Sequence, residues 1–208
     1  MATASSSPAR SPAAESRLYL VTGARPDLAT FLEAAVRGGV DLVQLREKSL
    51  PDAELLPVLG KAREITRQLG VSLVVNDRPD LAVLVGADCV HVGQDDLPIE
   101  AVRRFGLPVG LSTHSPEELA RAEADYVGVG PVFATPTKEG RPAAGLEYVR
   151  HAARHARSPW FAIGGIDETN VGAVVAAGAQ RIAVVRAIGE ADDPERAARN
   201  LRGALGGD

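Results

Sequence analysis

The 208-residue sequence lacks several features that define common functional classes. Its single cysteine, Cys89, excludes internal disulfides and cysteine-based zinc sites, and it fits a reducing compartment. No uncharged apolar run approaches the roughly 20 residues that a membrane-spanning helix needs. The formal net charge is −4, so there is no general basic excess for binding nucleic acid or an anionic membrane. We expect no nucleic-acid or membrane partner, and any bound anion must meet a local positive cluster.

The first sixteen residues, MATASSSPARSPAAES, consist mostly of serine, alanine and proline. This composition predicts a disordered tail over residues 1–16 in which nothing packs. A secretory signal would need an apolar stretch of about 7–15 residues after a basic start, and this segment has none. We therefore expect a cytoplasmic protein whose single compact domain spans residues 17–208.

From Arg17 onward, short β-rich runs alternate with longer segments in which apolar residues recur at helical spacing. The predicted strands are LYLVT (18–22), LVQL (42–45), SLVVN (72–76), CVHV (89–92), PVGLS (108–112), YVGVG (126–130), WFAI (160–163) and RIAVV (181–185). This alternation predicts an α/β fold, a single (β/α)8 TIM barrel. A doubly wound open sheet is the alternative, but it normally has a glycine-rich turn after its first strand, and TGARPD matches that turn poorly.

A sequence pattern that repeats within the chain supports the barrel. The segments GGVDLVQL, VGADCVHV, AEADYVGV and AAGAQRIAV each end a helix in small residues and then enter a strand. An aspartate stands at the turn in the first three, and Gln180 takes its place in the fourth. The pattern recurs at every second strand, as expected of a barrel built from repeated units.

In a barrel of this kind, active-site residues lie at the carboxyl ends of the strands. The second predicted strand ends in Gln44, Arg46 and Lys48, which share one face because strand side chains alternate. A solvated charge run is the alternative, but these residues follow directly on a buried strand. Because Arg grips two phosphate oxygens and Lys adds a point charge, we predict that this strand end binds a phosphate or diphosphate.

Aspartates follow the next two predicted strands. Asp77 comes after SLVVN, next to Asn76, and Asp96 follows CVHV. Because neighbouring strands are about 4.8 Å apart, the two carboxylates can converge on one ion. An all-oxygen site suits Mg²⁺, which usually takes one or two protein carboxylates and completes its shell with water and substrate phosphate. Alternatively, each aspartate caps the helix that follows it.

The segment after the sixth predicted strand, residues 131–145, is longer than the two to six residues usual for such a loop. It carries Thr135, Thr137 and Lys138, two hydroxyls and a cation that flank a stiff proline. We interpret it as a lid that brings Lys138 onto a charged substrate. An idle surface loop is the alternative.

The seventh predicted strand is followed by Gly164 and Gly165, and the eighth ends at Val185 and Arg186. Loops at these places commonly hold phosphate on backbone N–H groups, and glycine allows close approach. Simple turn chemistry is the alternative for the glycine pair. Arg186 adds a charge that can reach the same phosphate.

Three further polar residues near strand ends receive lesser roles. We interpret His91 and His114 as hydrogen-bonded structural residues. Ser112 is a candidate polar contact to a substrate, but it has neither an identifiable base partner nor a nucleophile elbow. Two separate anion sites on one barrel mouth suggest two phosphorylated small-molecule substrates.

Seven short motifs, in order, resemble those of the thiamine-phosphate synthase family. They are QLREK (44–48), ND (76–77), HVGQDD (91–96), S-x-H (112–114), GPVFATPTK (130–138), AIGGI (162–166) and the AVVxAI frame (183–188). The resemblance extends from about residue 18 to about residue 205.

The resemblance implies that 4-amino-2-methyl-5-hydroxymethylpyrimidine diphosphate is joined to 4-methyl-5-(2-hydroxyethyl)thiazole phosphate, with release of diphosphate. The family's roles, carried over by motif, fall on three groups of residues. The pyrimidine diphosphate group is Gln44, Arg46, Lys48, Asn76, Ser112 and Lys138, of which Arg46, Lys48 and Lys138 are the catalytic cations. Asp77 and Asp96 fall on Mg²⁺, and Thr135, Thr137, Gly165, Val185 and Arg186 fall around the thiazole phosphate. The family's mechanism is dissociative and needs no protein nucleophile.

One departure and two alternatives accompany this resemblance. The AVVxAI frame often carries serine where this chain has Arg186, so the role of that side chain is open. A related barrel, the thiazole tautomerase, resembles the second half of the chain but is not expected to keep the pair Asp77 and Asp96. A non-catalytic barrel that only senses phosphorylated ligands is the second alternative. The sequence leaves the oligomeric state open.

Overall fold

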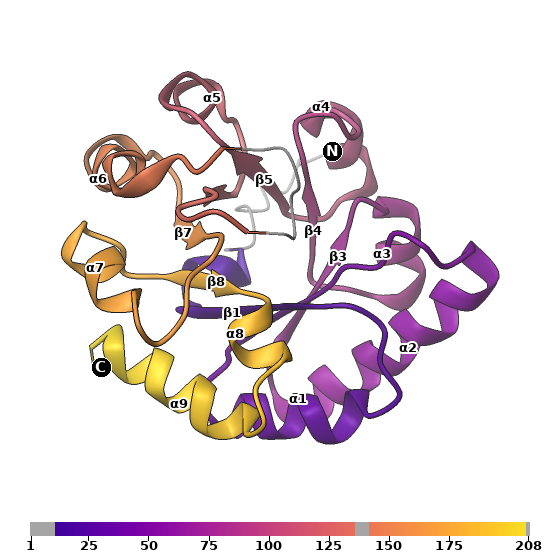
Figure 1. Cartoon of the computed structure of the whole chain (residues 1–208). Helices are drawn as coiled ribbons and strands as arrows, with labels where there is room; N and C mark the ends of the chain where they lie inside the picture. The colour runs from indigo at the N-terminus through magenta and orange to yellow at the C-terminus, as the bar shows by residue number, and fades with distance from the viewer. Residues whose placement is uncertain (1–10, 136–141, 207–208) are drawn as a thin grey trace, which may run out of the picture.

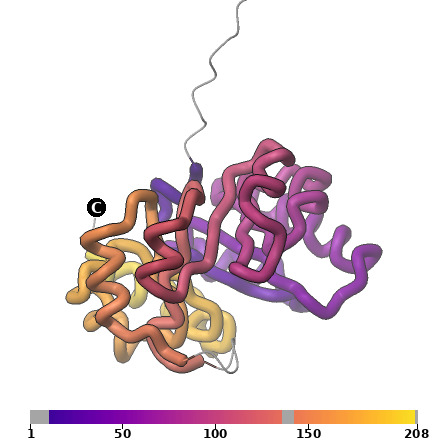
Figure 2. The backbone as a smooth tube through the Cα atoms, turned by 90° about the horizontal axis from the view of Figure 1, so that it is seen from above, coloured from indigo at the N-terminus to yellow at the C-terminus, as the bar shows by residue number. Residues whose placement is uncertain are grey.

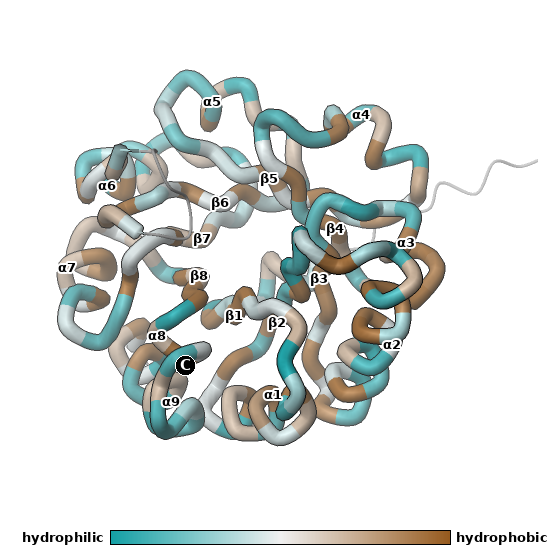
Figure 3. The backbone as a smooth tube through the Cα atoms, turned by 45° about the vertical axis from the view of Figure 1, so that its right-hand side comes forward, coloured by the Kyte–Doolittle hydropathy of each residue, from teal (hydrophilic) through white to brown (hydrophobic). Residues whose placement is uncertain are grey.

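The computed structural model describes residues 11–135 and 142–206, in which eight parallel strands form a closed ring. Each strand pairs with the next, and the last pairs with the first (Figures 1 and 3). The strands are β1 (Leu18–Thr22), β2 (Leu42–Leu45), β3 (Ser72–Asn76), β4 (Cys89–Val92), β5 (Val109–Thr113), β6 (Tyr126–Val129), β7 (Trp160–Ile163) and β8 (Ile182–Val184). This closure confirms the predicted barrel and excludes the open sheet.

Helices surround the ring in Figure 3. They are α1 (Leu28–Arg37), α2 (Asp52–Leu69), α3 (Pro79–Val85), α4 (Ile99–Val102), α5 (Pro116–Arg121), α6 (Gly145–His155), α7 (Val171–Ala176), α8 (Arg186–Gly189) and α9 (Pro194–Ala204), with 3-10 turns η1 (Pro12–Ala14) and η2 (Arg103–Phe105). None of the helices in the described ranges has both the length and the apolar character to cross a membrane.

The helices are held by apolar residues at helical spacing. In α1, Leu28, Phe31, Leu32 and Ala35 are all buried, because positions three and four apart share one helix face. This face packs in the core between the strands and the helices. Helix α9 lies beside α1 in Figure 1, so the last helix closes the ring against the first.

Alternation along the strands separates two apolar layers. Val43 and Leu45 of β2 pack outward against the helices, whereas Leu42 belongs to a second cluster inside the barrel. Aromatic rings fill much of this interior. The Tyr19 and Phe161 ring centroids are 5.1 Å apart at an interplanar angle of 62°, an edge-on contact.

The start of the described chain corrects the predicted tail. Residues 12–14 form η1, and the Ala13 side chain is fully buried among the residues inside the barrel. Arg181, just before β8, donates to the carbonyls of Ala14 and Ser16 at 2.8 and 3.1 Å. Small side chains here fit into the amino-terminal end of the barrel, so the expectation that nothing in residues 1–16 packs is wrong for residues 11–16. Figure 2 shows this first described segment, in indigo, at one edge of the tube.

The aspartates of the repeated sequence pattern have a structural role. Asp41, Asp88 and Asp125 each stand just before an even-numbered strand and accept a hydrogen bond from a backbone N–H in the first two residues of the preceding odd-numbered strand. The N···O distances are 3.0 Å to Leu18, 2.8 Å to Leu73 and 2.8 Å to Val109. Each aspartate also pairs with an arginine, respectively Arg202, Arg63 and Arg103. These contacts fasten adjacent strands at the end of the barrel opposite their carboxyl ends.

Candidate active site

A cavity of about 480 Å³ opens at the carboxyl ends of the strands. Among its lining residues are eleven that the sequence predicted for the site: Gln44, Arg46, Lys48, Asn76, Asp77, Asp96, Ser112, Thr135, Gly165, Val185 and Arg186. Two other predicted residues, Thr137 and Lys138, lie outside the described ranges. The carboxyl ends of separate strands therefore bring together residues that lie up to 142 positions apart in the chain.

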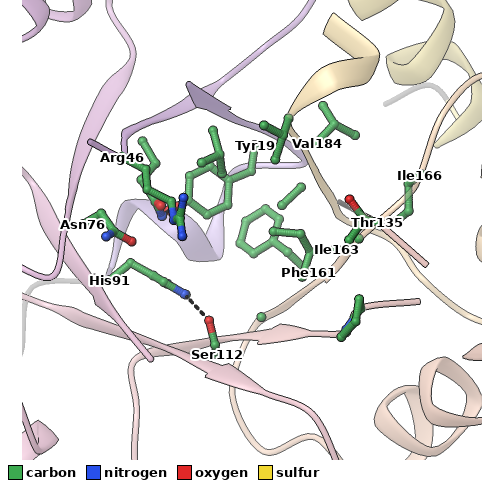
Figure 4. A pocket seen from close by; sticks show the side chains of 18 of the residues that line it. Tyr19, Arg46, Asn76, His91, Ser112, Thr135, Phe161, Ile163, Ile166 and Val184 are labelled. Atoms are coloured by element: carbon green, nitrogen blue, oxygen red, sulfur yellow. Dashed lines mark hydrogen bonds between the residues drawn. The ribbon is translucent and has the colours of Figure 1, made fainter. Parts of the chain in front are cut away.

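The end of β2 supplies two cations and an amide to one wall of this cavity. Gln44 is buried, and its Nε2 donates to the Tyr19 hydroxyl. The Arg46 side chain points into the cavity in Figure 4, and no carboxylate of the described residues pairs with its guanidinium. Lys48 Nζ lies 2.9 Å from Asp77 Oδ2 and is half exposed. This wall can therefore offer Arg46 to an anion without breaking an existing ion pair.

Asp77 has an unusual backbone conformation. Its φ of 60° lies in the left-handed region, which aspartate tolerates better than most residues, and its N–H donates to the His91 carbonyl at 2.8 Å. Burial raises the pKa of its carboxyl, the Lys48 ammonium opposes that shift, and the nearby Asp96 carboxyl adds to it. The two aspartates are thus neighbours that share a partly desolvated site.

Neither aspartate caps the helix that follows it. Helix α3 begins after Arg78 and α4 after Pro98, and no side chain caps either helix. Asp96 Oδ2 instead accepts from the Gly93 N–H at 2.7 Å. The helix-cap alternative is therefore wrong at both positions.

The donor set suits a divalent cation held partly by a ligand. Two carboxylates meet at one point, and the cation now beside Asp77 is the Lys48 ammonium. No group of three or more His, Cys, Asp or Glu side chains able to hold a metal occurs in the ranges that the structure describes. Because Mg²⁺ commonly takes only one or two protein carboxylates and fills its shell with water and phosphate, these residues fit it.

Asn76 carries the one buried side-chain nitrogen or oxygen of the described residues that lacks a hydrogen-bond partner. Asn76 is the last residue of β3 and lines the cavity on the same side as Arg46 (Figure 4). Leaving a buried donor unpaired costs about 1–3 kcal/mol. A bound acceptor would remove that cost, so the wall is prepared for an oxygen or nitrogen of a ligand.

The opposite wall is built from the ends of β6, β7 and β8. Gly165 has a φ of 64°, and a Cβ there would lie 2.8 Å from Phe133 Cβ, so this close turn requires glycine. Val185 precedes α8, whose first N–H groups have no carbonyl partner within the helix. Arg186 pairs with Glu190 at 3.9 Å and is nearly half exposed. This wall can therefore offer backbone N–H groups to an anion.

Sequence reasoning did not foresee the floor of the cavity. Tyr19, Tyr126 and Phe161 form it, and their rings come from β1, β6 and β7. Strand alternation places Tyr19 and Gln44 inside the barrel, but it does not show that they touch.

Two of the three residues given lesser roles, His91 and Ser112, form a pair. His91 Nε2 lies 3.0 Å from Ser112 Oγ, as Figure 4 shows, and His91 Nδ1 lies 3.2 Å from the Tyr126 hydroxyl. Ser112 therefore has an imidazole partner that the sequence did not reveal. His114 is also hydrogen-bonded, through Nδ1 to the Gly130 carbonyl.

Comparison with known proteins assigns the chain to a family. The family model described as "Thiamine monophosphate synthase" matches residues 18–188, from the first residue of β1 into α8. The chain belongs to this family. The match includes all eight strands and therefore both walls of the cavity.

Individual members of the thiamine monophosphate synthase family are similar over nearly the whole chain. The Thiamine-phosphate synthase of Thermus thermophilus is 54% identical, over 92% of this chain and 98% of that protein. The Thiamine-phosphate synthase of Gloeobacter violaceus is 51% identical over 93% of this chain, which spans only 59% of that relative's length. A solved structure of the thiamine phosphate pyrophosphorylase from Pyrococcus furiosus superposes with a TM-score of 0.84 at 33% identity, covering 93% of this chain and 96% of that one.

Proposed function

We propose that this family member is a thiamine-phosphate synthase. It joins 4-amino-2-methyl-5-hydroxymethylpyrimidine diphosphate to 4-methyl-5-(2-hydroxyethyl)thiazole phosphate and releases diphosphate. The observation that carries the proposal is that Asp77 and Asp96 lie together on the cavity wall with Arg46, Lys48 and Asn76, whose Nδ2 has no hydrogen-bond partner. That combination suits a diphosphate, which has more charge and more oxygens than a monophosphate, and it does not suit an uncharged ligand.

In this proposal, the wall formed by β2 to β4 holds the pyrimidine diphosphate. The Arg46 guanidinium grips two diphosphate oxygens, and Lys48 leaves Asp77 to contact a third. Gln44, Asn76 and Ser112 give hydrogen-bonding groups to the pyrimidine or to the diphosphate next to it. Asn76 Nδ2 gains the acceptor that it lacks in the structure.

We assign Asp77 and Asp96 as the residues that would hold Mg²⁺. When bound there, the ion would supply positive charge to offset the charge on the diphosphate. The raised pKa of Asp77 supports this assignment, because a cation in the site would favour the ionised form that burial and Asp96 disfavour.

The wall formed by β6 to β8 holds the thiazole phosphate in this proposal. The backbone N–H groups of the Gly165 turn and of the residues after Val185 donate to the phosphate, and Thr135 contributes a hydroxyl at the rim. Thr137 is assigned here from the sequence alone. Arg186 already pairs with Glu190, so we give its side chain a secondary role in orienting the phosphate.

The chemistry follows from the charge distribution. As the bond between the pyrimidine methylene carbon and the diphosphate oxygen breaks, negative charge grows on the diphosphate, where Arg46, Lys48 and Lys138 stabilise it. The thiazole nitrogen then forms the new bond to carbon. No protein nucleophile takes part. The aromatic rings of the floor exclude water from the pyrimidine-methyl cation that is left when the diphosphate departs.

The direct experiment incubates the purified protein with both substrates, with Mg²⁺ and with excess EDTA. We expect thiamine phosphate and diphosphate in equal amounts with Mg²⁺ and little of either with EDTA. Binding of both substrates without diphosphate release would favour the sensor alternative. Conversion of the thiazole alone would favour the tautomerase alternative.

Steady-state kinetics can separate the roles of two cations. If Lys138 acts mainly on the departing diphosphate, Lys138→Ala lowers kcat and kcat/KM together, because the contact belongs to the transition state. Arg46→Ala also raises KM for the pyrimidine substrate, because Arg46 holds the diphosphate before reaction as well. KM for the thiazole phosphate should change less than about twofold in both variants, an effect under roughly 0.5 kcal/mol. An unchanged kcat in Lys138→Ala would remove that residue from the mechanism.

We further propose a cytoplasmic location. The single cysteine supports it, because a reducing compartment does not require disulfides. Detection of the protein in a cell fraction freed of membranes and secreted material tests this location.

A further inference from the structure

A chain of hydrogen bonds crosses the floor of the cavity from β2 to β5. Gln44 Nε2 donates to the Tyr19 hydroxyl, which lies 3.2 Å from the Tyr126 hydroxyl. The Tyr126 hydroxyl lies 3.2 Å from His91 Nδ1, and His91 Nε2 lies 3.0 Å from Ser112 Oγ. Two residues assigned to the pyrimidine substrate, Gln44 and Ser112, are thus joined through three others whose polar groups have no assigned function.

The available hydrogens set the direction of this chain. Each phenol has one hydrogen, and both tyrosines are buried, with 2% and 0% of Tyr19 and Tyr126 exposed. Tyr19 already accepts from Gln44. If Tyr126 also donated to Tyr19, the Tyr19 hydrogen would have no acceptor among the described residues, and leaving a buried donor unpaired is unfavourable. Tyr19 therefore donates to Tyr126.

The same assignment of donors and acceptors extends from Tyr126 to Ser112. Tyr126 accepts from Tyr19 and donates to His91 Nδ1. A neutral imidazole that accepts at Nδ1 carries its hydrogen on Nε2, so His91 donates to Ser112 Oγ. Burial raises the pKa of both Tyr19 and Tyr126 well above the usual value, which keeps both phenols protonated.

We infer that Tyr126 and His91 are positioning residues that fix the direction of the Ser112 hydroxyl, so that Ser112 offers its hydrogen to an acceptor in the cavity. With the opposite direction, Ser112 would donate to His91 and present only lone pairs to a ligand. The ligand atom facing Ser112 is therefore a hydrogen-bond acceptor, either a diphosphate oxygen or a ring nitrogen of the pyrimidine. The identity of that substrate rests on the proposed function, whereas the direction of the chain does not.

The first test measures the tautomer of His91 in the substrate-free protein by ¹⁵N NMR. The sequence has four histidines, and the signal missing from His91→Gln identifies the one required. We expect the neutral form with hydrogen on Nε2. A hydrogen on Nδ1, or on both nitrogens, would overturn the inference. Because this measurement needs no substrate, it remains decisive even if the protein makes no thiamine phosphate.

The second test removes single hydroxyls. Tyr126→Phe removes the donor to His91 Nδ1, so we expect the Nδ1–H tautomer to become populated and kcat/KM for the pyrimidine diphosphate to fall at least tenfold. KM for the thiazole phosphate should change less than twofold. Tyr19→Phe leaves Tyr126 able to donate, so the tautomer should stay on Nε2. A Tyr126→Phe protein with the wild-type tautomer and wild-type kinetics would contradict the inference.

Tyr148→Phe is the matched control. The Tyr148 hydroxyl is also buried and donates to Thr113 Oγ1 at 2.8 Å, but it lies outside the chain. This variant should keep the His91 tautomer and kcat/KM within twofold. If Tyr126→Phe does not fold, the wild-type tautomer alone decides the direction.

Ser112→Ala identifies the acceptor. Binding is measured with two probes, inorganic diphosphate with Mg²⁺ and the hydroxymethylpyrimidine without diphosphate. A loss of at least fivefold in affinity for the first probe indicates a phosphate oxygen, and for the second a ring nitrogen. Unchanged affinity for both would mean that Ser112 donates to neither, against the inference.

Discussion

Gly110 makes space for one ring of the cavity floor. A Cβ at this position would lie 2.1 Å from Tyr126 Cζ and 2.5 Å from its hydroxyl oxygen, closer than atoms can approach. The two residues are also register partners on β5 and β6. Gly110 therefore allows the Tyr126 hydroxyl to reach His91, although it carries no side chain itself.

We expect Gly110→Ala to lower both stability and activity. The added methyl group overpacks a full interior, which typically costs about 1–3 kcal/mol, and the Tyr126 ring must move away from His91. Urea unfolding and kcat/KM measure the two effects. Gly60→Ala on α2 is the control, because a Cβ there meets nothing within 4 Å, and it should stabilise the helix by up to about 1 kcal/mol. Equal stability of Gly110→Ala and the wild type would mean that the ring moves without cost.

Asp77 combines a carboxylate that we propose as a metal ligand with an unfavourable setting. Its raised pKa means that the folded state disfavours the ionised form, so the charge weakens the fold at neutral pH, and that penalty disappears as the pH falls through the folded pKa. We expect Asp77→Asn to abolish most turnover without lowering the midpoint of thermal unfolding. Asparagine also tolerates the left-handed backbone at φ 60°. Calorimetry and diphosphate release measure the two properties, and a large loss of stability would indicate a structural role instead.

The short turn η1 acts as an element that closes one end of the barrel. Ala13 packs inside the barrel, and Ser11 Oγ lies 3.9 Å from the Cys89 sulfur at the start of β4. Burial raises the pKa of the Cys89 thiol to about 12. The thiol therefore stays protonated and shielded while this segment is in place.

Deleting residues 1–16 should lower the melting temperature and expose Cys89. We expect the thiol of the wild type to resist iodoacetamide at pH 8 and that of the deletion variant to react. Deleting only residues 1–10 is the control, because it keeps every contact described for Ser11, Ala13, Ala14 and Ser16. Identical melting temperatures for the variant lacking 1–16 and the wild type would show that the contacts of η1 contribute nothing.

The same thiol gives a pH dependence. Unfolding returns the Cys89 pKa from about 12 to its ordinary value near 9. Because the unfolded chain then releases a proton that the folded chain retains, stability should fall as the pH rises through this window. Urea unfolding of the wild type and of Cys89→Ala at pH 8 and pH 10.5 measures the effect. The wild type should lose more stability between the two pH values than the variant does.

At the scale of the whole molecule, the barrel separates stability from function at its two ends. Asp41, Asp88 and Asp125 fasten strand starts, whereas the cavity occupies the strand ends. We expect Asp88→Ala to cost about 1–3 kcal/mol, because the buried Leu73 N–H loses its acceptor and Arg63 loses its partner. For a domain of this size, each kcal/mol lowers the melting temperature by about 2–4 °C.

The kcat of Asp88→Ala should stay within about twofold of the wild type, since no cavity residue changes. The exposed Asp192, after α8, serves as the control for removal of a carboxylate, and Asp192→Ala should leave the melting temperature unchanged. If Asp88→Ala lost activity without losing stability, the separation between the two ends of the barrel would be wrong.

Much of the fold was readable from local sequence. Five of the eight predicted strands match the structure residue for residue, and the other three differ by one residue at one or both ends: β5 is shifted to Val109–Thr113, β6 ends at Val129, and β8 is Ile182–Val184. Short β-rich runs between helical patterns determine such strands locally. Alternation then determined that Gln44 faces inward and Leu45 outward, and position after a strand placed Asp77 and Asp96 at the mouth.

Only the tertiary structure decided which side chains touch. Strand alternation states the direction of Tyr19, His91 and Tyr126, but not the strand register or the distance that each ring spans across the barrel. The hydrogen bond from His91 to Ser112 and the space above Gly110 depend on both. The packing of Ala13 was likewise hidden, because small residues in a serine and proline-rich segment carry no periodic signal, and only the shape of the barrel end makes a place for them.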